Sequence, residues 1–337
     1  MSMKIISFNS YKGGACRTTT CYNTLPYLAK ELGATSRQPI LVFDIDLDSM
    51  GLTSIFHEGI PATSQEMPYS AKHLFVDDGT SISREAINGI QRGMPEEYYK
   101  HFEKVGEDLG LEDDGSVLFL GADRNAATIT DSDYKKFANN SPINEIIREL
   151  KDLDEDKMPK AIVFDCASGV QMTTLVALQQ SDCAVVCMRP TYQFRVGTAD
   201  YILRQIPNEI DKNTSSQKRK VVLLPTAVAQ VNVPSEDPNC EAALSVLNNR
   251  RKKAFISIEK EIVDQYENEN AREFGKLSYV LNTEMLSDRE DGVRGLPEVE
   301  RFKWQEELLY KLSENEMTLQ EKSLKRKYEK LAKIIAE

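Results

Sequence analysis

The chain has 337 residues, and its 42 basic and 53 acidic side chains give a formal net charge of −11. Apolar residues make up 41% and charged residues 28%, which is a globular composition and excludes a disordered chain, a collagen or a small disulfide scaffold. The acidic total also argues against nucleic-acid binding by the whole surface, although a local basic patch remains compatible with it.

The sequence carries no sign of a membrane span or a disulfide framework. No stretch approaches the roughly 18 apolar residues of a membrane-spanning helix. Residues 1–8 hold one lysine and a short apolar run, which we interpret as a first strand because a signal peptide has a longer apolar core. The six cysteines form no CxxC pair and no Cys/His cluster, so we expect free thiols, a cytoplasmic location and no structural zinc site.

Unbroken apolar runs of strand length alternate with helical patterns along most of the chain. Strands without polar alternation are buried on both faces, as in a parallel sheet that helices cover. The alternation therefore predicts an α/β fold with a doubly wound, mostly parallel sheet and helices on both faces. The predicted strands are Lys4–Asn9, Ile40–Phe43, Val117–Leu120, Ala161–Phe164, Cys183–Cys187 and Val221–Leu224.

Two further segments stand out from this alternation. Residues 57–115 interrupt it, and the part from Phe75 to Gly115 holds 11 acidic and 4 basic side chains, so we expect a largely helical, acidic surface insertion. Residues 317–337 have the pattern of a final helix with one narrow apolar stripe. We see no internal repeat or linker, and a single domain spanning residues 1–337 is the simplest organisation.

The most informative motif is Ser10–Thr19, which reads SYKGGACRTT between the first predicted strand and the first predicted helix. Its glycines allow backbone N–H groups to turn toward phosphate oxygens, and the start of the following helix adds the positive end of a dipole. The hydroxyl of Thr18 is suited to a Mg²⁺ ion. These features predict a phosphate-binding loop.

This loop resembles the deviant Walker A motif of the ParA/MinD ATPases, which reads KGGxGKT. It is more similar still to a branch whose loop reads SYKGGVGRT and whose second strand ends in DLDLEAPGL, since Ser10–Thr18 and Asp44–Leu52 (DIDLDSMGL) follow both patterns. The resemblance covers residues 4–56 and 117 to about 230. It implies a P-loop NTPase fold of the SIMIBI type, ATP and Mg²⁺ as ligands, and a homodimer that encloses nucleotide.

The resemblance also assigns roles within the loop. Lys12 would reach the phosphates of the partner subunit as a catalytic residue, Thr18 would bind Mg²⁺ and Thr19 would lie near the α-phosphate. The remaining nucleotide-binding positions are Gly13, Gly14, Ala15, Cys16 and Arg17.

Two positions depart from the usual loop. Arg17 replaces its lysine and offers a planar fork to the phosphates instead of a point charge. Cys16 replaces its last glycine, where a side chain crowds the loop and a positive φ would be costly.

Phosphoryl transfer requires a metal ion and a positioned water, which carboxylates at the ends of adjacent strands can supply. The resemblance implies that Asp44 and Asp165 hold Mg²⁺ and that Asp46 orients the attacking water as the second catalytic residue. Asp48 remains an alternative to Asp46, because Asp46-Leu47-Asp48 also fits the motif of the family. Gly169 would sense the γ-phosphate through its N–H. Taken singly, each Asp could also be a helix cap or a turn residue.

Signals for the base and for partners are weaker. Pro225 and Thr226 follow a predicted strand and would flank the base, or form an ordinary turn, because the asparagine of many relatives is absent. The basic clusters Lys218–Lys220 and Arg250–Lys253 suit nucleic acid or an acidic partner, but without interleaved aromatics a solvated surface is favoured. The final helix lacks Phe and Trp on its stripe, which favours packing over membrane binding. We interpret Trp304 as a core or interface aromatic.

The leading hypothesis is a cytoplasmic, slowly hydrolysing ATP switch that dimerises around nucleotide and signals to a partner protein. The alternative is a non-hydrolysing pseudo-ATPase that serves as a scaffold or regulatory subunit. A bacterial-type tyrosine kinase is a weaker hypothesis, since Tyr310 and Tyr328 do not form the terminal tyrosine cluster of that class. An iron-protein-like electron carrier would need cysteines in a different placement.

Overall fold

A computed structural model of the chain describes residues 2–58, 69–75, 81–122, 142–210, 219–228, 238–272, 278–287, 294–299 and 308–337. These residues build one sheet with the strand order β3-β4-β2-β5-β1-β6-β7-β8. Every neighbouring pair is parallel except β3 and β4, which are antiparallel. The strands are β1 Lys4–Ser10, β2 Ile40–Asp44, β3 Glu103–Lys104, β4 Val117–Leu120, β5 Ala161–Ser168, β6 Cys183–Met188, β7 Arg219–Pro225 and β8 Tyr279–Asn282.

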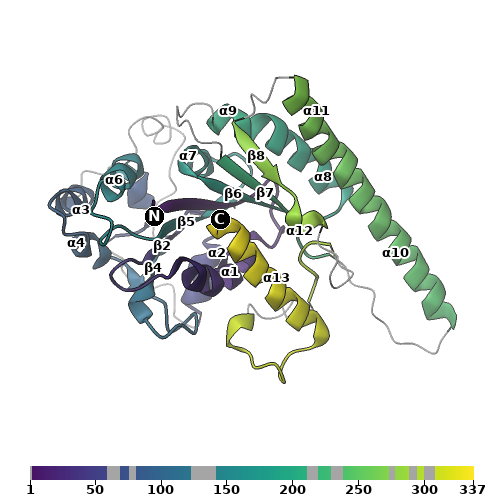
Figure 1. Cartoon of the computed structure of the whole chain (residues 1–337), viewed down its shortest axis with the longest axis horizontal. Helices are drawn as coiled ribbons and strands as arrows, with labels where there is room; N and C mark the ends of the chain where they lie inside the picture. The colour runs from purple at the N-terminus through teal and green to yellow at the C-terminus, as the bar shows by residue number, and fades with distance from the viewer. Residues whose placement is uncertain are drawn as a thin grey trace.

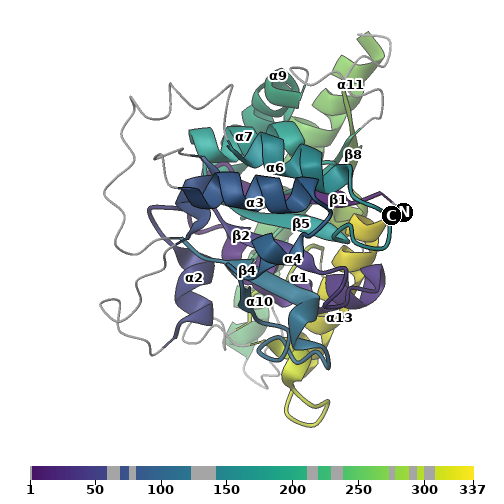
Figure 2. The same cartoon turned by 90° about the vertical axis from the view of Figure 1, so that its left-hand side faces the viewer.

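Helices cover both faces of this sheet, as Figures 1 and 2 show. The α-helices are α1 Arg17–Leu32, α2 Gly51–Phe56, α3 Ser81–Gln91, α4 Glu96–Tyr99, α6 Pro142–Lys151, α7 Met172–Gln180, α8 Tyr192–Asp200, α9 Ile206–Ile210, α10 Pro238–Ile258, α11 Asp264–Arg272, α12 Glu284–Ser287 and α13 Leu319–Ala336. The short 3₁₀ segments are η2 Ala71–Leu74, η3 Asp114–Ser116 and η7 Leu309–Lys311, and the π-helical segments are η4 Tyr201–Gln205 and η5 Glu259–Val263.

The core is divided by the sheet because successive side chains of each strand point to opposite faces. On one face, Phe8 and Val163 pack with apolar residues of α1 and α13. On the other face, Ile5 and Phe164 pack with α3, α6 and α7, and a third cluster joins β6–β8 to the helices from α8 to α11. This doubly wound arrangement confirms the predicted fold class.

The predicted strands all form, and the shared strand register brings the predicted site together. Asp44 at the end of β2 lies opposite Asp165 in β5, and Phe8 of β1 lies opposite the same Asp165. The loop that follows β1 therefore emerges beside both carboxylates, at the carboxyl edge of the sheet where ligands of open α/β folds bind.

Helix α13 packs along α1, and its stripe of Leu324, Tyr328, Leu331 and Ile335 is buried. Its carboxyl end is held by two lysines of the sheet. Lys220 donates from Nζ to the carbonyl of Ile334 at 2.6 Å, and Lys4 donates to the carbonyl of Ala336. Lysines at this end satisfy free carbonyls and oppose the negative end of the helix dipole. The stripe thus packs on the body of the protein, as the sequence favoured.

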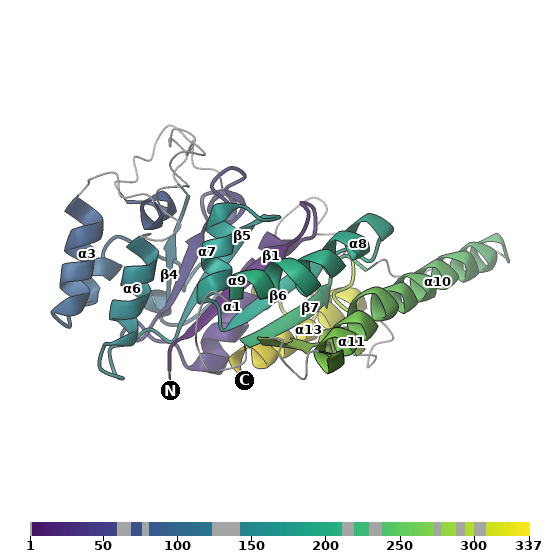
Figure 3. The same ribbon diagram turned by 90° about the horizontal axis from the view of Figure 1, so that it is seen from above.

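Two other regions add detail to the sequence prediction. The described part of 57–115 contains α3 and α4, but it also contributes β3 to the edge of the sheet. Helix α10 continues through η5 into α11 as one long segment that extends away from the sheet (Figure 3). Arg250–Lys253 lie on α10, whereas Lys218 and Trp304 lie outside the described residues. None of the helices in the described ranges is long and apolar enough to cross a membrane.

Packing of α13 can be tested with two leucines of the same helix. Leu331 is fully buried, whereas Leu319 is 83% exposed. We expect Leu331→Ala to lower the free energy of unfolding by about 2–5 kcal/mol, because it removes buried methyl groups and leaves a cavity. Leu319→Ala should change it by no more than about 0.5 kcal/mol. Urea unfolding measures both, and equal effects would contradict the packing of this stripe.

Candidate nucleotide-binding site

The predicted phosphate loop connects β1 to α1 and curls through two left-handed residues in the half that leads into α1. Gly14 has φ 77°, and Cys16 has φ 53° and ψ 29° immediately before α1 begins at Arg17. The hydroxyl of Thr226 donates to the carbonyl of Ala15 at 2.7 Å and ties the loop to the end of β7. The loop is therefore closed back onto the sheet with its backbone already curled.

Cys16 has the positive φ that the sequence analysis identified as costly at this position. A left-handed conformation brings Cβ too close to the following carbonyl oxygen, at a cost of roughly 1–2 kcal/mol for a residue other than glycine. Cys16 holds that conformation, which a glycine at this position would adopt without the cost. Strain of this kind persists where surrounding contacts fix the backbone.

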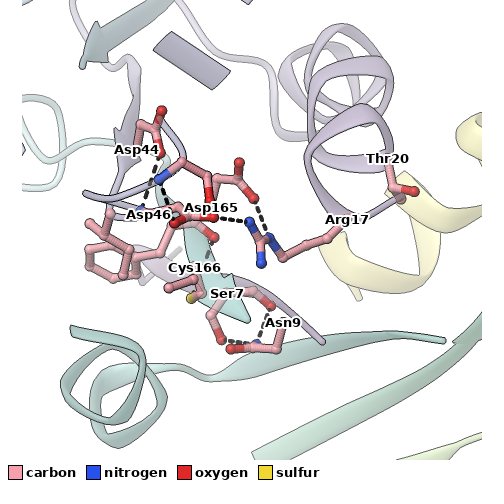
Figure 4. Close-up of polar contacts among 12 residues, drawn as sticks. Ser7, Asn9, Arg17, Thr20, Asp44, Asp46, Asp165 and Cys166 are labelled. Atoms are coloured by element: carbon pink, nitrogen blue, oxygen red, sulfur yellow. Dashed lines mark hydrogen bonds and ion pairs between the residues drawn. The ribbon is translucent and has the colours of Figure 1, made fainter. Parts of the chain in front are cut away.

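Arg17 does not point out of the loop toward solvent but lies between two carboxylates (Figure 4). Its Nε donates to Oδ1 of Asp165 at 2.9 Å, and its Nη2 donates to Oδ2 of Asp46 at 2.7 Å. The side chain of Arg17 is only 9% exposed. Burial lowers the pKa of Arg17, but the two carboxylates outweigh burial, so the pKa is raised and the charge is firmly held.

Asp165 is completely buried at the end of the apolar part of β5. Burial raises its pKa, while the charge of Arg17 and the neighbouring Thr18 hydroxyl lower it. The second oxygen, Oδ2, is buried and has no hydrogen-bond partner among the described residues. A buried oxygen of this kind is costly unless a ligand, an ion or water satisfies it.

Asp44 is engaged by the turn that follows it. Its Oδ2 accepts from both the backbone N–H and the hydroxyl of Thr53, each at 2.7 Å, and its Oδ1 accepts from the N–H of Asp46. Burial, followed by the nearby charge of Asp165, raises the pKa of Asp44 to about 7, against the effect of the Thr53 hydrogen bonds. Asp44 therefore shapes the segment that carries Asp46, whereas Asp48 is exposed.

The donor set fits a magnesium ion that is completed by phosphates. Within the described ranges, no group of three or more His, Cys, Asp or Glu side chains is arranged to hold a metal by itself. Mg²⁺ usually takes one or two carboxylates and keeps water and substrate phosphates as its other ligands. The unpaired Oδ2 of Asp165 and the adjacent Thr18 provide that kind of partial site.

Lys12 and Gly169 lie on the solvent side of the loop. Lys12 is exposed, and its Nζ donates to Oε1 of Gln193 on α8 at 3.0 Å. The ring of Tyr11 covers Gly197 so closely that a Cβ there would meet the ring at 1.9 Å. Gly169 has φ 78°, and its N–H donates to the carbonyl of Ser10. The N–H that the resemblance assigns to the γ-phosphate is thus engaged by Ser10 in this structure.

A cavity of about 140 Å³ lies beside the loop, on the side where the sequence placed the base. Thr226 lines it, while Pro225 uses its carbonyl to accept from the N–H of Leu296. Walls that the sequence did not predict come from Arg189, from residues 296–299 and from Tyr328 of α13. A larger cavity of about 630 Å³ includes Lys4 and Lys160 at the opposite edge of the sheet.

Comparisons with known proteins show the fold. No protein-family model matches the sequence, and no curated protein matches it. McdA of Cyanothece in complex with ATP is similar in structure, with 13% identity, coverage of 99% of this chain and 96% of McdA, and a TM-score of 0.53.

Two other solved structures score lower. A pNOB8 ParA bound to nonspecific DNA shares 15% identity over 99% of this chain and 96% of its own, with a TM-score of 0.48. A plasmid partition protein from Borrelia burgdorferi shares 15% identity over 74% and 86% of the two chains, with a TM-score of 0.44. The chain therefore shares the fold of McdA, a doubly wound, mostly parallel sheet with helices on both faces, which is the fold class that the resemblance of its loop implied.

The strain at Cys16 predicts an order of stability for two variants that both lose the sulfur. Cys16→Gly removes the Cβ that makes a positive φ costly, whereas Cys16→Ala keeps it. We expect the Gly variant to be more stable than the Ala variant and to unfold at a higher temperature. The difference in the free energy of unfolding should be at most about 1 kcal/mol, because the greater freedom of glycine in the unfolded chain offsets part of the relieved strain. Thermal unfolding measures this difference, and an Ala variant that is equally stable would contradict it.

The raised pKa of Asp44 predicts a pH-dependent effect of Asp44→Asn. The folded protein keeps a proton on Asp44 up to about pH 7, whereas an unfolded chain loses it near pH 4. The folded state binds more protons in that window, so the stability contributed by this group falls as the pH rises from about 4 to about 7. The Asn variant lacks this loss.

The stability of Asp44→Asn relative to the wild type should therefore increase as the pH rises from about 4 to about 7. Denaturant unfolding at several pH values measures this difference. A difference between the two proteins that does not change with pH would contradict the raised pKa.

Proposed function

We propose that this protein is an ATP-binding molecular switch that hydrolyses ATP slowly with the help of Mg²⁺. The observation that carries the proposal is the convergence of a curled Gly-Gly loop, Arg17 and the carboxylates of Asp46 and Asp165 at one edge of the sheet. Charged clamps, a metal and an oriented water are what phosphoryl transfer requires. The loop N–H groups of residues 13–19 would receive the phosphates, and the cavity lined by Thr226 would receive the base.

In this proposal, different residues near Arg17 hold the metal and orient the attacking water. Thr18 and Asp165 would hold Mg²⁺, which would neutralise charge on the phosphates. Asp46 would orient the attacking water once Arg17 has moved to the phosphates. Asp44 would support Asp46 by holding the turn through Thr53, which differs from the role that the resemblance implies, namely holding Mg²⁺ through water.

A homodimer around nucleotide is supported by the surface beside the loop. Four large apolar side chains there are exposed, namely Tyr11, Val170, Tyr192 and Val196. Lys12 lies at the same surface and is free to exchange Gln193 for another acceptor. Exposed apolar groups that gather around a charged site are typical of interaction surfaces. We propose that this surface closes on a second copy when nucleotide is bound, and that Lys12 then acts on the partner's phosphates.

The partner that reads the closed state is proposed to be another protein in the cytoplasm. Arg250, Lys252 and Lys253 on α10 are exposed and suit an acidic surface. Nucleic acid is a less favoured ligand of this helix, and membrane binding through α13 is disfavoured because its apolar stripe is buried.

We propose that residues 1–337 act as a single domain.

A second candidate function is a nucleotide holder that does not hydrolyse ATP. The ion pairs of Arg17 favour it, because they engage the charge that a rapid ATPase needs on the phosphates. In this case the protein would bind nucleotide as a scaffold or regulatory subunit.

Phosphate release by the purified protein with ATP and Mg²⁺ tests the proposal, with nucleotide-dependent light scattering as a measure of dimer formation. We expect slow release in the wild type and loss on the order of 100-fold or more in Asp46→Ala, with ATP binding retained. Asp48→Ala is the matched control and should remain active, because Asp48 is exposed.

Unchanged activity of Asp46→Ala would remove the role of Asp46. Bound ATP without phosphate release would establish the second candidate, and a wild type that does not bind ATP would refute the proposal.

A further inference from the structure

The position of Arg17 has a consequence for how the metal enters. Its guanidinium contacts one oxygen of Asp165 and one oxygen of Asp46, with both carboxylates almost fully buried. Asp165 is the carboxylate proposed to hold Mg²⁺ through its other oxygen, Oδ2, and Asp46 is the neighbouring carboxylate that the same guanidinium contacts. The guanidinium and the metal would therefore compete for the same negative charges.

Arg17 cannot leave this place by losing its proton, because an arginine stays charged in proteins. It can leave only if another cation replaces it on the carboxylates or if another anion attracts it. The triphosphate supplies the anion and Mg²⁺ supplies the cation. Neither one is sufficient: the metal alone leaves Arg17 without an acceptor, and the nucleotide alone leaves two buried carboxylates without a cation.

We propose that Arg17 is an internal counter-cation that neutralises Asp46 and Asp165 in the nucleotide-free protein and thereby weakens binding of a divalent cation until a triphosphate arrives. This inference rests on the proposed function for the identity of the ligand. The exchange couples the two ligands, so Mg²⁺ and nucleotide each strengthen binding of the other, as linkage requires. The free protein accordingly binds divalent cations weakly, although it holds buried carboxylates.

A point charge would serve this purpose less well than an arginine. The Nε and Nη2 donors of Arg17 reach two carboxylates at once, at 2.9 Å and 2.7 Å. A lysine has one compact charged group and cannot form this fork. Replacement of the usual loop lysine by Arg17 is therefore expected to make the resting state tighter and the dependence on Mg²⁺ steeper.

Electron paramagnetic resonance of Mn²⁺ in the absence of nucleotide tests the proposal, because it counts bound metal without any need for activity. We expect the wild type to bind Mn²⁺ weakly and Arg17→Ala to bind it at least about 10-fold more tightly. Arg37→Ala is the matched control, since Arg37 pairs with Asp156 on the surface, and it should behave as the wild type does.

A second measurement uses a fluorescent ATP analogue with Mg²⁺ or with EDTA. The wild type should bind the analogue at least about 10-fold more tightly with Mg²⁺, and this ratio should fall in Arg17→Lys, which retains a charge in the loop. Should Arg17→Ala fail to fold, Arg17→Lys takes its place in the Mn²⁺ experiment, with a smaller gain expected.

The two ways of failing can be told apart. A wild type that binds the analogue with Mg²⁺ but also binds Mn²⁺ alone as tightly as the Arg17 variants would overturn this inference and leave the proposed function intact. A wild type that does not bind the analogue under any condition would overturn the proposed function itself.

Discussion

The ion pairs of Arg17 with Asp46 and Asp165 are the interaction on which the rest of the site depends. They place one positive charge between two buried negative charges, where a single unpaired member would be strongly destabilising. The first turn of α1, the segment after β2 and strand β5 are joined through this one side chain.

The fold provides the precision that this arrangement needs. Asp44 and Asp165 are paired in register across β2 and β5, and β1 delivers the loop beside them. Thr53 fixes Asp44, Asp44 fixes the backbone of Asp46, and Asp46 meets Arg17. Rigid strands thus position a short chain of polar contacts, and local backbone strain at Cys16 is tolerated because the loop is held at both ends.

The sequence predicted the parts of the structure whose signal is local. The buried strands form as predicted. A strand that is covered by helices on both faces of the sheet has a continuous apolar run, and such a run can be recognised in the sequence. The short β3 and β8 were missed, since each lies at an edge of the sheet and Val280 of β8 is 49% exposed. Tyr328 and Pro297 beside the loop could not be predicted, because they come from distant segments that only the folded chain brings to the cavity.

The most direct test of the account is a crystal structure of the protein with Mg²⁺ and a non-hydrolysable ATP analogue. The account predicts that the triphosphate lies in the loop of residues 12–19, that the metal contacts Asp165, and that the guanidinium of Arg17 has moved from the carboxylates to the phosphates. A structure in which nucleotide binds elsewhere, or in which Arg17 still joins Asp46 to Asp165 beside bound nucleotide, would contradict it.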